Sequence, residues 1–74
     1  MSAAELIKAL KIYKYEAERQ KGGHIRLVTI LNGEHHVTIP NHNPLRIGTL
    51  SSILSEVATH LSKTKEEVIE KLFS

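Results

Sequence analysis

The sequence of 74 residues contains no cysteine and no aspartate. Without cysteine there is no disulfide framework, no thiolate zinc site and no cysteine nucleophile. Without aspartate, a two-metal nuclease centre built from clustered carboxylates is hard to assemble. No apolar run approaches the roughly 18 residues that a membrane-spanning helix needs, and the N-terminus lacks the features of a signal peptide. We therefore expect a cytoplasmic protein that does not bind a membrane.

The length predicts one domain over residues 1–74 and leaves no room for a second. A domain of this size buries only roughly 60–65% of the surface that its unfolded chain exposes. The core is therefore thin. A partner protein or a second copy could complete it, and the sequence leaves the oligomeric state open.

Charge is distributed unevenly along the chain, although Lys and Arg number ten against eight Glu, a net charge of +2. Residues 1–46 hold seven basic residues against four Glu, a net +3, whereas residues 47–74 hold three against four, a net −1. Four of the five histidines lie between residues 24 and 42. The first part of the chain is thus the part suited to a polyanion such as RNA.

The periodicity of apolar residues predicts a helix, three strands and two further helices. Ser2 and Glu5 form a capping-box pattern that precedes a helix over residues 3–12. Alternation predicts a strand over 15–20, a turn at 21–23, and strands over 25–31 and 34–39. A stripe from Leu50 to Leu61 predicts a helix that begins at Gly48 or Thr49, and a second capping box at Thr64 begins a short last helix.

The Asn32-Gly33 pair predicts a two-residue type I′ hairpin turn, because both central residues of that turn need positive φ. This turn would place Val28 opposite Val37. The buried face of the hairpin would then consist of Val28, Ile30, Val37 and Ile39.

These elements predict an α+β fold of order α-β-β-β-α, with a three-stranded antiparallel sheet, helices on one face and a short C-terminal helix. This is the order of the double-stranded-RNA-binding domain, although fold order alone does not establish function.

The segment Lys21-Gly22-Gly23-His24 is the first candidate site. A glycine pair lets a ligand approach the backbone closely, and Arg19, Lys21 and Arg26 could hold phosphate. A histidine there could take the proton of an RNA 2′-hydroxyl, and the freed oxygen could then attack the adjacent phosphorus without a metal. An ordinary glycine turn followed by an exposed histidine is the alternative, which spacing alone favours.

The segment around His42, followed by Gly48-Thr49 at a helix start, is a weaker candidate, because helix N–H groups suit an anion. An ordinary strand end and helix cap explain it equally well. His35 and His36 are neighbours in a strand and so point to opposite faces. We expect no metal site and no cofactor, and we expect Tyr13 and Tyr15 to pack in the core.

Four segments in this order resemble the HicA family of toxins, also called YcfA-like mRNA interferases, of type II toxin–antitoxin systems. They are residues 5–10, 15–24, 38–42 and 48–54. The second resembles the family's Gly-Ser-His segment, the third its strand end with a second histidine, and the fourth its Gly-Thr-Leu helix. The resemblance as a whole extends over nearly the entire chain, and the order and spacing of these segments are more specific than any one of them.

The resemblance implies a double-stranded-RNA-binding-like fold, cleavage of mRNA with His24 as the catalytic residue, and a HicB-type antitoxin partner. We expect RNA contacts from Arg19, Lys21, Gly22, Gly23, Arg26 and His42. A homodimer and a toxin–antitoxin hetero-oligomer both remain open. Gly23 stands where the family has serine, and Ile25 where many members have another histidine. The alternatives are therefore an RNA-binding module without catalysis and a protein whose main role is to bind a partner.

Overall fold

The computed structural model describes all 74 residues. In chain order it contains the helix α1 (Ala3–Leu10), the short 3-10 helix η1 (Lys11–Tyr13), the strands β1 (Glu16–Lys21), β2 (His24–Thr29) and β3 (His35–Pro40), and the helices α2 (Ile47–Leu61) and α3 (Lys65–Phe73). This order confirms the predicted α+β fold of α-β-β-β-α type with a short C-terminal helix.

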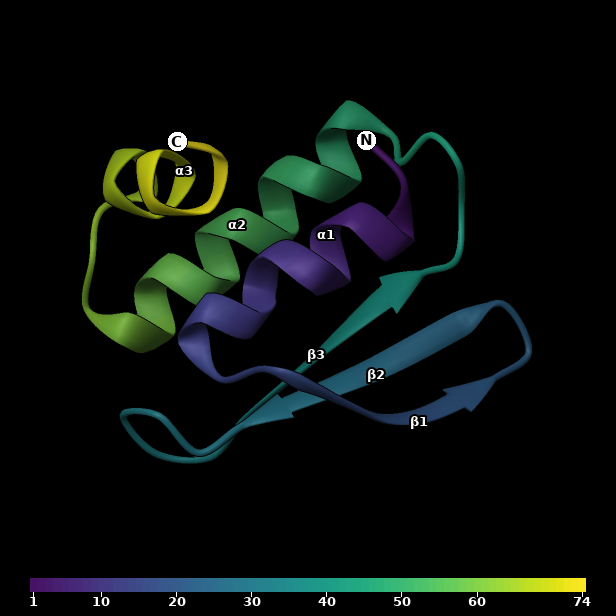
Figure 1. Ribbon diagram of the computed structural model, residues 1–74, viewed down its shortest axis with the longest axis horizontal. Coiled ribbons are helices and arrows are strands. Elements are labelled where there is room, and N and C mark those ends of the chain that lie inside the picture. The colour runs from purple at the N-terminus through teal and green to yellow at the C-terminus, as the bar shows by residue number, and fades with distance from the viewer.

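The three strands form one antiparallel sheet in the order β1-β2-β3. All helices lie on one side of this sheet, as predicted, and the other side is open (Figure 1). The β1–β2 turn and the β2–β3 loop lie at opposite ends of the sheet (Figure 1). The open side is called the outer face below, and the side under the helices is called the inner face.

The helix ends follow the local signals in the sequence. Both capping boxes form: the Ser2 hydroxyl accepts from the Glu5 N–H while the Glu5 carboxylate accepts from the Ser2 N–H, and Thr64 and Glu67 repeat the arrangement. The first helix ends at Leu10, two residues earlier than predicted, and continues as η1 until Lys14 adopts a left-handed φ of 66°. The second helix begins at Ile47, just before the predicted start.

The predicted register of the β2–β3 hairpin is wrong by one residue. Leu27 pairs with Val37, and the strands are joined by a five-residue loop between Thr29 and His35. Asn32 and Gly33 have the positive φ values expected of an Asn-Gly turn, but the turn is closed by the Gly33 N–H on the Ile30 carbonyl. A one-residue slip reverses the faces of a strand. Consequently Leu27 and Thr29 are buried, and Ile30 is 81% exposed.

Tertiary contacts of Thr29 explain this slip. Its hydroxyl donates to the Tyr13 carbonyl at 2.8 Å and accepts from the Leu31 N–H at 3.1 Å. The strand therefore ends at Thr29, and Ile30 and Leu31 enter the loop. A buried hydroxyl without these partners would be costly. The long-range bonds of Thr29 thus override the local preference for a two-residue turn.

The core lies between the inner face and the helices and contains fifteen buried apolar residues. Tyr13 and Tyr15 belong to it, which confirms the prediction that both tyrosines pack inside. Leu27, Val37 and Ile39 supply the sheet side of the core. The other core residues come from the helices and their connections: Ala3, Leu6, Leu10, Leu45, Ile53, Leu54, Val57, Ala58, Leu61 and Val68.

A cluster of Tyr15, His35 and His60 fastens the β2–β3 loop to α2. The His35 Nδ1 lies 2.7 Å from the Tyr15 hydroxyl, and the His35 and His60 rings stack at 4.4 Å between centroids. Burial and the nearby Glu56 raise the pKa of Tyr15 to about 12. The phenol therefore stays protonated and donates to His35. His60 Nε2 donates to the carbonyls of Leu31 and Gly33 at 2.9 and 3.0 Å.

We expect the free energy of unfolding to fall as the pH drops below the ordinary histidine pKa of 6.5. Burial and the adjacent His60 lower the pKa of His35, although Glu56 acts in the opposite direction. The unfolded chain then binds a proton more readily at this residue than the folded protein does. The stabilising contribution of neutral His35 is complete above pH 6.5 and is lost as the pH falls through the pKa of the folded state.

Urea unfolding between about pH 5 and about pH 7.5, compared with that of His35→Gln, measures this contribution. The variant should show a weaker dependence of stability on pH, whatever its absolute stability. An equal dependence in both proteins would contradict the assignment.

Candidate functional site

The β1–β2 turn presents the predicted glycine pair to solvent. Lys21 and His24 form the last pair of the two strands, so Gly22 and Gly23 alone make the turn. Gly22 has a φ of +60°, which glycine adopts without strain. No side chain or backbone atom of the rest of the chain lies within 4 Å of where a Cβ would stand on either glycine. The turn is therefore open, and a ligand can reach its backbone directly.

The structure brings the predicted basic residues and His24 to one face. His24 pairs with Lys21, and Arg26 pairs with Arg19, and directly paired residues share a face of the sheet. Leu27 follows Arg26 and is buried under the helices, so these four side chains, which point the opposite way, belong to the outer face. All four are exposed. A phosphate backbone that crosses this end of the sheet would meet three cations beside an imidazole.

The end of β3 lies next to the β1–β2 turn, so the main chain of His42 lies close to this turn. Pro40 pairs with His24, and the Asn41 N–H donates to the Gly23 carbonyl at 2.6 Å. The His42 carbonyl accepts from the Ala3 N–H at 3.1 Å, which fixes the main chain there against the start of α1. The His42 side chain is exposed and forms no hydrogen bond with His24.

The weaker candidate at the start of α2 keeps free backbone donors. Gly48 and Thr49 lie in its first turn, and the N-cap residue Arg46 makes no side-chain bond to them. No contact that the structure records joins this helix start to His24.

Arg26 is held in a network that the sequence analysis did not foresee. Its Nε lies 3.6 Å from a Glu18 oxygen and 3.2 Å from His36 Nδ1. The same His36 nitrogen lies 3.1 Å from Glu18, and His36 Nε2 lies 2.7 Å from Glu34. Glu18 reaches this face because a bulge between Ala17 and Arg19 interrupts the alternation of β1. The bulge cannot be read from the sequence.

The protonation of His36 decides how Arg26 is held. A neutral ring with its proton on Nε2 donates to Glu34, and its Nδ1 then accepts from Arg26. A protonated ring donates to both carboxylates instead, and Glu18 is then the only partner of Arg26. Arg26 is therefore partly neutralised within the fold. Lys21 and Arg19 form no ion pair and are the cations free to meet a phosphate.

His24 has the access that a general base requires. Its imidazole is exposed and makes no hydrogen bond within the chain, so both ring nitrogens face solvent or a ligand. Nothing in the fold orients the ring, and a bound substrate would have to do so. No three histidine or carboxylate side chains come together in an arrangement that could hold a metal ion.

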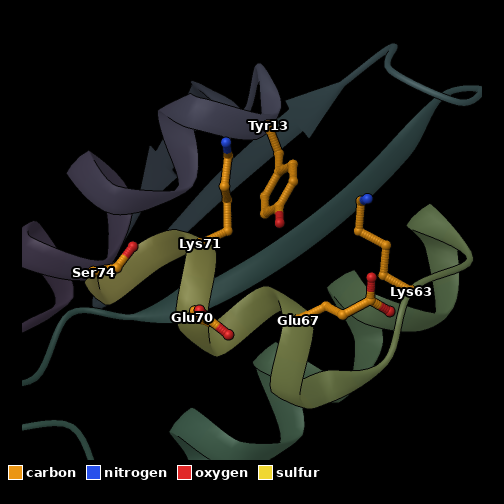
Figure 2. A pocket seen from close by; sticks show the side chains of 6 residues that line it. All are labelled: Tyr13, Lys63, Glu67, Glu70, Lys71 and Ser74. Carbon is orange, nitrogen blue, oxygen red and sulfur yellow. The ribbon is translucent and has the colours of Figure 1, made fainter.

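A separate hollow of about 400 Å³ lies between η1 and α3, and Figure 2 shows the residues that line it. The Tyr13 ring points into it between Lys63 and Lys71 (Figure 2). Burial and the nearby Glu67 raise the pKa of Tyr13, which keeps its hydroxyl neutral. Charges of both signs line this hollow, with two lysines against Glu67 and Glu70. It has neither the histidine nor the excess of cations found at the outer face.

A comparison with known protein families gives a match to this chain. The family model described as the HicA toxin of bacterial toxin–antitoxin systems matches residues 3–58, which is most of the chain. No curated protein and no solved structure matches. None of the helices combines the length and the apolar character that crossing a bilayer requires. The chain therefore belongs to the HicA family of toxins of bacterial toxin–antitoxin systems.

Proposed function

We propose that this chain is an endoribonuclease that inactivates mRNA, with His24 as the general base. The observation that carries the proposal is the pairing of His24 with Lys21 at an exposed glycine turn, with Arg19 and Arg26 on the same face. Cations at this position attract the RNA backbone, and an accessible imidazole nitrogen can accept a proton. The substrate is RNA because the reaction needs a 2′-hydroxyl.

In the proposed reaction His24 accepts the proton of a ribose 2′-hydroxyl. The 2′-oxygen forms a bond to the adjacent phosphorus, and the bond from phosphorus to the 5′-oxygen of the next nucleotide breaks. The leaving oxygen takes up a proton, which His42 or water donates. The products are a 2′,3′-cyclic phosphate and a 5′-hydroxyl. Lys21 and Arg19 stabilise the charge that develops on the phosphate oxygens.

Gly22 and Gly23 let the RNA backbone approach the turn, and Arg26 contributes once a phosphate competes with Glu18 for it. The site needs no metal for this chemistry, because the nucleophile belongs to the substrate. We further propose that the antitoxin of the pair is of the HicB type, and that the toxin acts on mRNA in the cytoplasm.

The experiment that tests this proposal incubates the purified protein with a mixed mRNA, with and without EDTA, and maps the fragment ends. We expect cleavage in both conditions, with cyclic phosphate on one end and a 5′-hydroxyl on the other. Cleavage that EDTA abolishes, or ends that carry a 5′-phosphate, would contradict the 2′-hydroxyl route. Intact RNA after incubation with folded protein would contradict nuclease activity itself.

Two observations favour a second candidate function, an RNA-binding module without catalysis. The His24 ring has no hydrogen-bond partner to orient it, and Gly23 offers no hydroxyl to a phosphate. A binding module would bind RNA without cleaving it. Its affinity would fall steeply as the salt concentration rises, because basic side chains that bind the phosphates release the counterions of the RNA. Binding and cleavage measured on the same RNA separate the two functions.

A further inference from the structure

We propose that the groove between η1 and the β2–β3 loop binds an acidic segment of the antitoxin, which packs an apolar side chain against Ile30 and Leu31. We call this the loop groove. Its volume is about 770 Å³. The residues that carry the argument are Lys11, Lys14, Tyr15, Glu16, Ile30 and Leu31.

The loop groove exposes large apolar side chains to solvent. Ile30 is 81% exposed and Leu31 is 41% exposed, next to each other in the chain. With Tyr15 they form the apolar lining of the loop groove. A contiguous apolar surface with a polar rim is typical of a protein-binding site.

The loop that carries Ile30 is fastened to the body of the protein. Asn32 Nδ2 donates to the His60 carbonyl at 2.8 Å, and the His60 ring donates back to two carbonyls of the loop. The Leu31 N–H donates to the Thr29 hydroxyl. The exposure of Ile30 is therefore a fixed feature of the loop. A rigid surface loses little conformational entropy when a partner binds.

The charge of the loop groove selects the kind of partner. Lys11 and Lys14 line it against the single carboxylate of Glu16, and neither lysine forms an ion pair within the chain. Acidic side chains that flank an apolar one would complement this lining. A second copy fits less well, because a two-fold contact would bring the lysines of both copies together. RNA fits less well, because two aliphatic side chains occupy the groove where bases need aromatic platforms.

The loop groove lies far from His24. His24 begins β2 and Ile30 follows its end, so the six residues of the strand separate them by about 20 Å. Figure 1 shows the two connections at opposite ends of the sheet. An antitoxin can therefore hold this groove whether or not it also covers His24. The inference does not depend on the ribonuclease activity proposed above.

The test measures the affinity of the antitoxin protein of this pair for three variants by calorimetry. Ile30→Glu and Lys14→Glu place a carboxylate in the loop groove, and each should weaken binding by roughly tenfold or more. Ile47→Glu is the matched control, because Ile47 is 86% exposed and lies on α2 outside the groove. It should bind as the wild type does. Thermal unfolding confirms that all variants are folded.

Three outcomes would overturn the proposal. Wild-type affinity in Ile30→Glu would show that the antitoxin does not use this surface. A wild-type dimer that Ile30→Glu converts to a monomer, with antitoxin affinity unchanged, would assign the groove to a second copy. Weaker RNA binding with unchanged antitoxin affinity would assign it to RNA. Loss of activity in His24→Ala with full antitoxin affinity would leave the proposal intact.

Discussion

Replacement of His24 by alanine is expected to lower the rate of RNA cleavage by roughly 10²- to 10⁴-fold, the usual contribution of a positioned general base. The side chain is exposed and makes no hydrogen bond within the chain, so its removal should leave the thermal unfolding temperature unchanged. RNA affinity should change little, because Lys21 and Arg19 remain in place. The loss should therefore appear in single-turnover cleavage and not in binding.

Thr38→Ala is the matched control for this experiment. Thr38 pairs with Arg26, is exposed and lies on the same outer face, but it carries no charge and makes no side-chain hydrogen bond. It should cleave RNA at the wild-type rate. Full activity in His24→Ala would refute the assignment of the base. An equal loss in both variants would show that the outer face tolerates no change, and that the histidine has no special role.

Leu27→Ala is expected to lower the free energy of unfolding by about 2–5 kcal/mol, the usual cost of a large cavity in a packed core. Leu27 has no exposed surface and lies in the middle of β2. Small domains are only marginally stable, with roughly 0.05–0.15 kcal/mol per residue. The substitution should therefore remove a large fraction of the stability of the protein. Urea unfolding monitored by circular dichroism measures the difference.

Val28→Ala separates the observed hairpin register from the one that the Asn-Gly turn predicts. Val28 pairs with His36 and points to the outer face, where it is only half-buried. The substitution should cost under about 1 kcal/mol, because little apolar area is lost. The opposite ranking, with Val28→Ala more damaging than Leu27→Ala, would mean that the register is that of the two-residue turn.

The features that could be predicted from the sequence depend on residues close together in the chain. Both capping boxes join residues three apart, and the stripe of α2 repeats within one helix. Each is stabilised by bonds that the segment makes with itself. The order of elements followed from these signals alone.

The register of the hairpin could not be predicted because distant residues decide it. Tyr13 binds the Thr29 hydroxyl from sixteen residues away, and His60 binds the loop carbonyls from α2. His60 lies in the last turn of α2, a helix that the sequence indicates only through its apolar stripe. Nothing near it in the sequence indicates that it caps a loop nearly thirty residues earlier.

At the candidate site, the sequence predicted which residues come together, but it did not predict the partners that neutralise Arg26. Lys21, the two glycines and His24 are adjacent in the chain, so any tight turn would bring them together. The partial neutralisation of Arg26 depends on the bulge in β1 and on the pairing of β2 with β3, which bring Glu18 and His36 to it. The role of each residue in RNA cleavage stays a prediction.

The helix α3 shows that the segment matched by the family model is shorter than the unit that folds. The family model ends at residue 58, yet Leu61 and Val68, which lie beyond it, are buried in the common core. Part of the core is thus supplied by the last sixteen residues, which the family model does not cover. A protein cut back to the matched segment would therefore leave the apolar surface under Leu61 and Val68 uncovered.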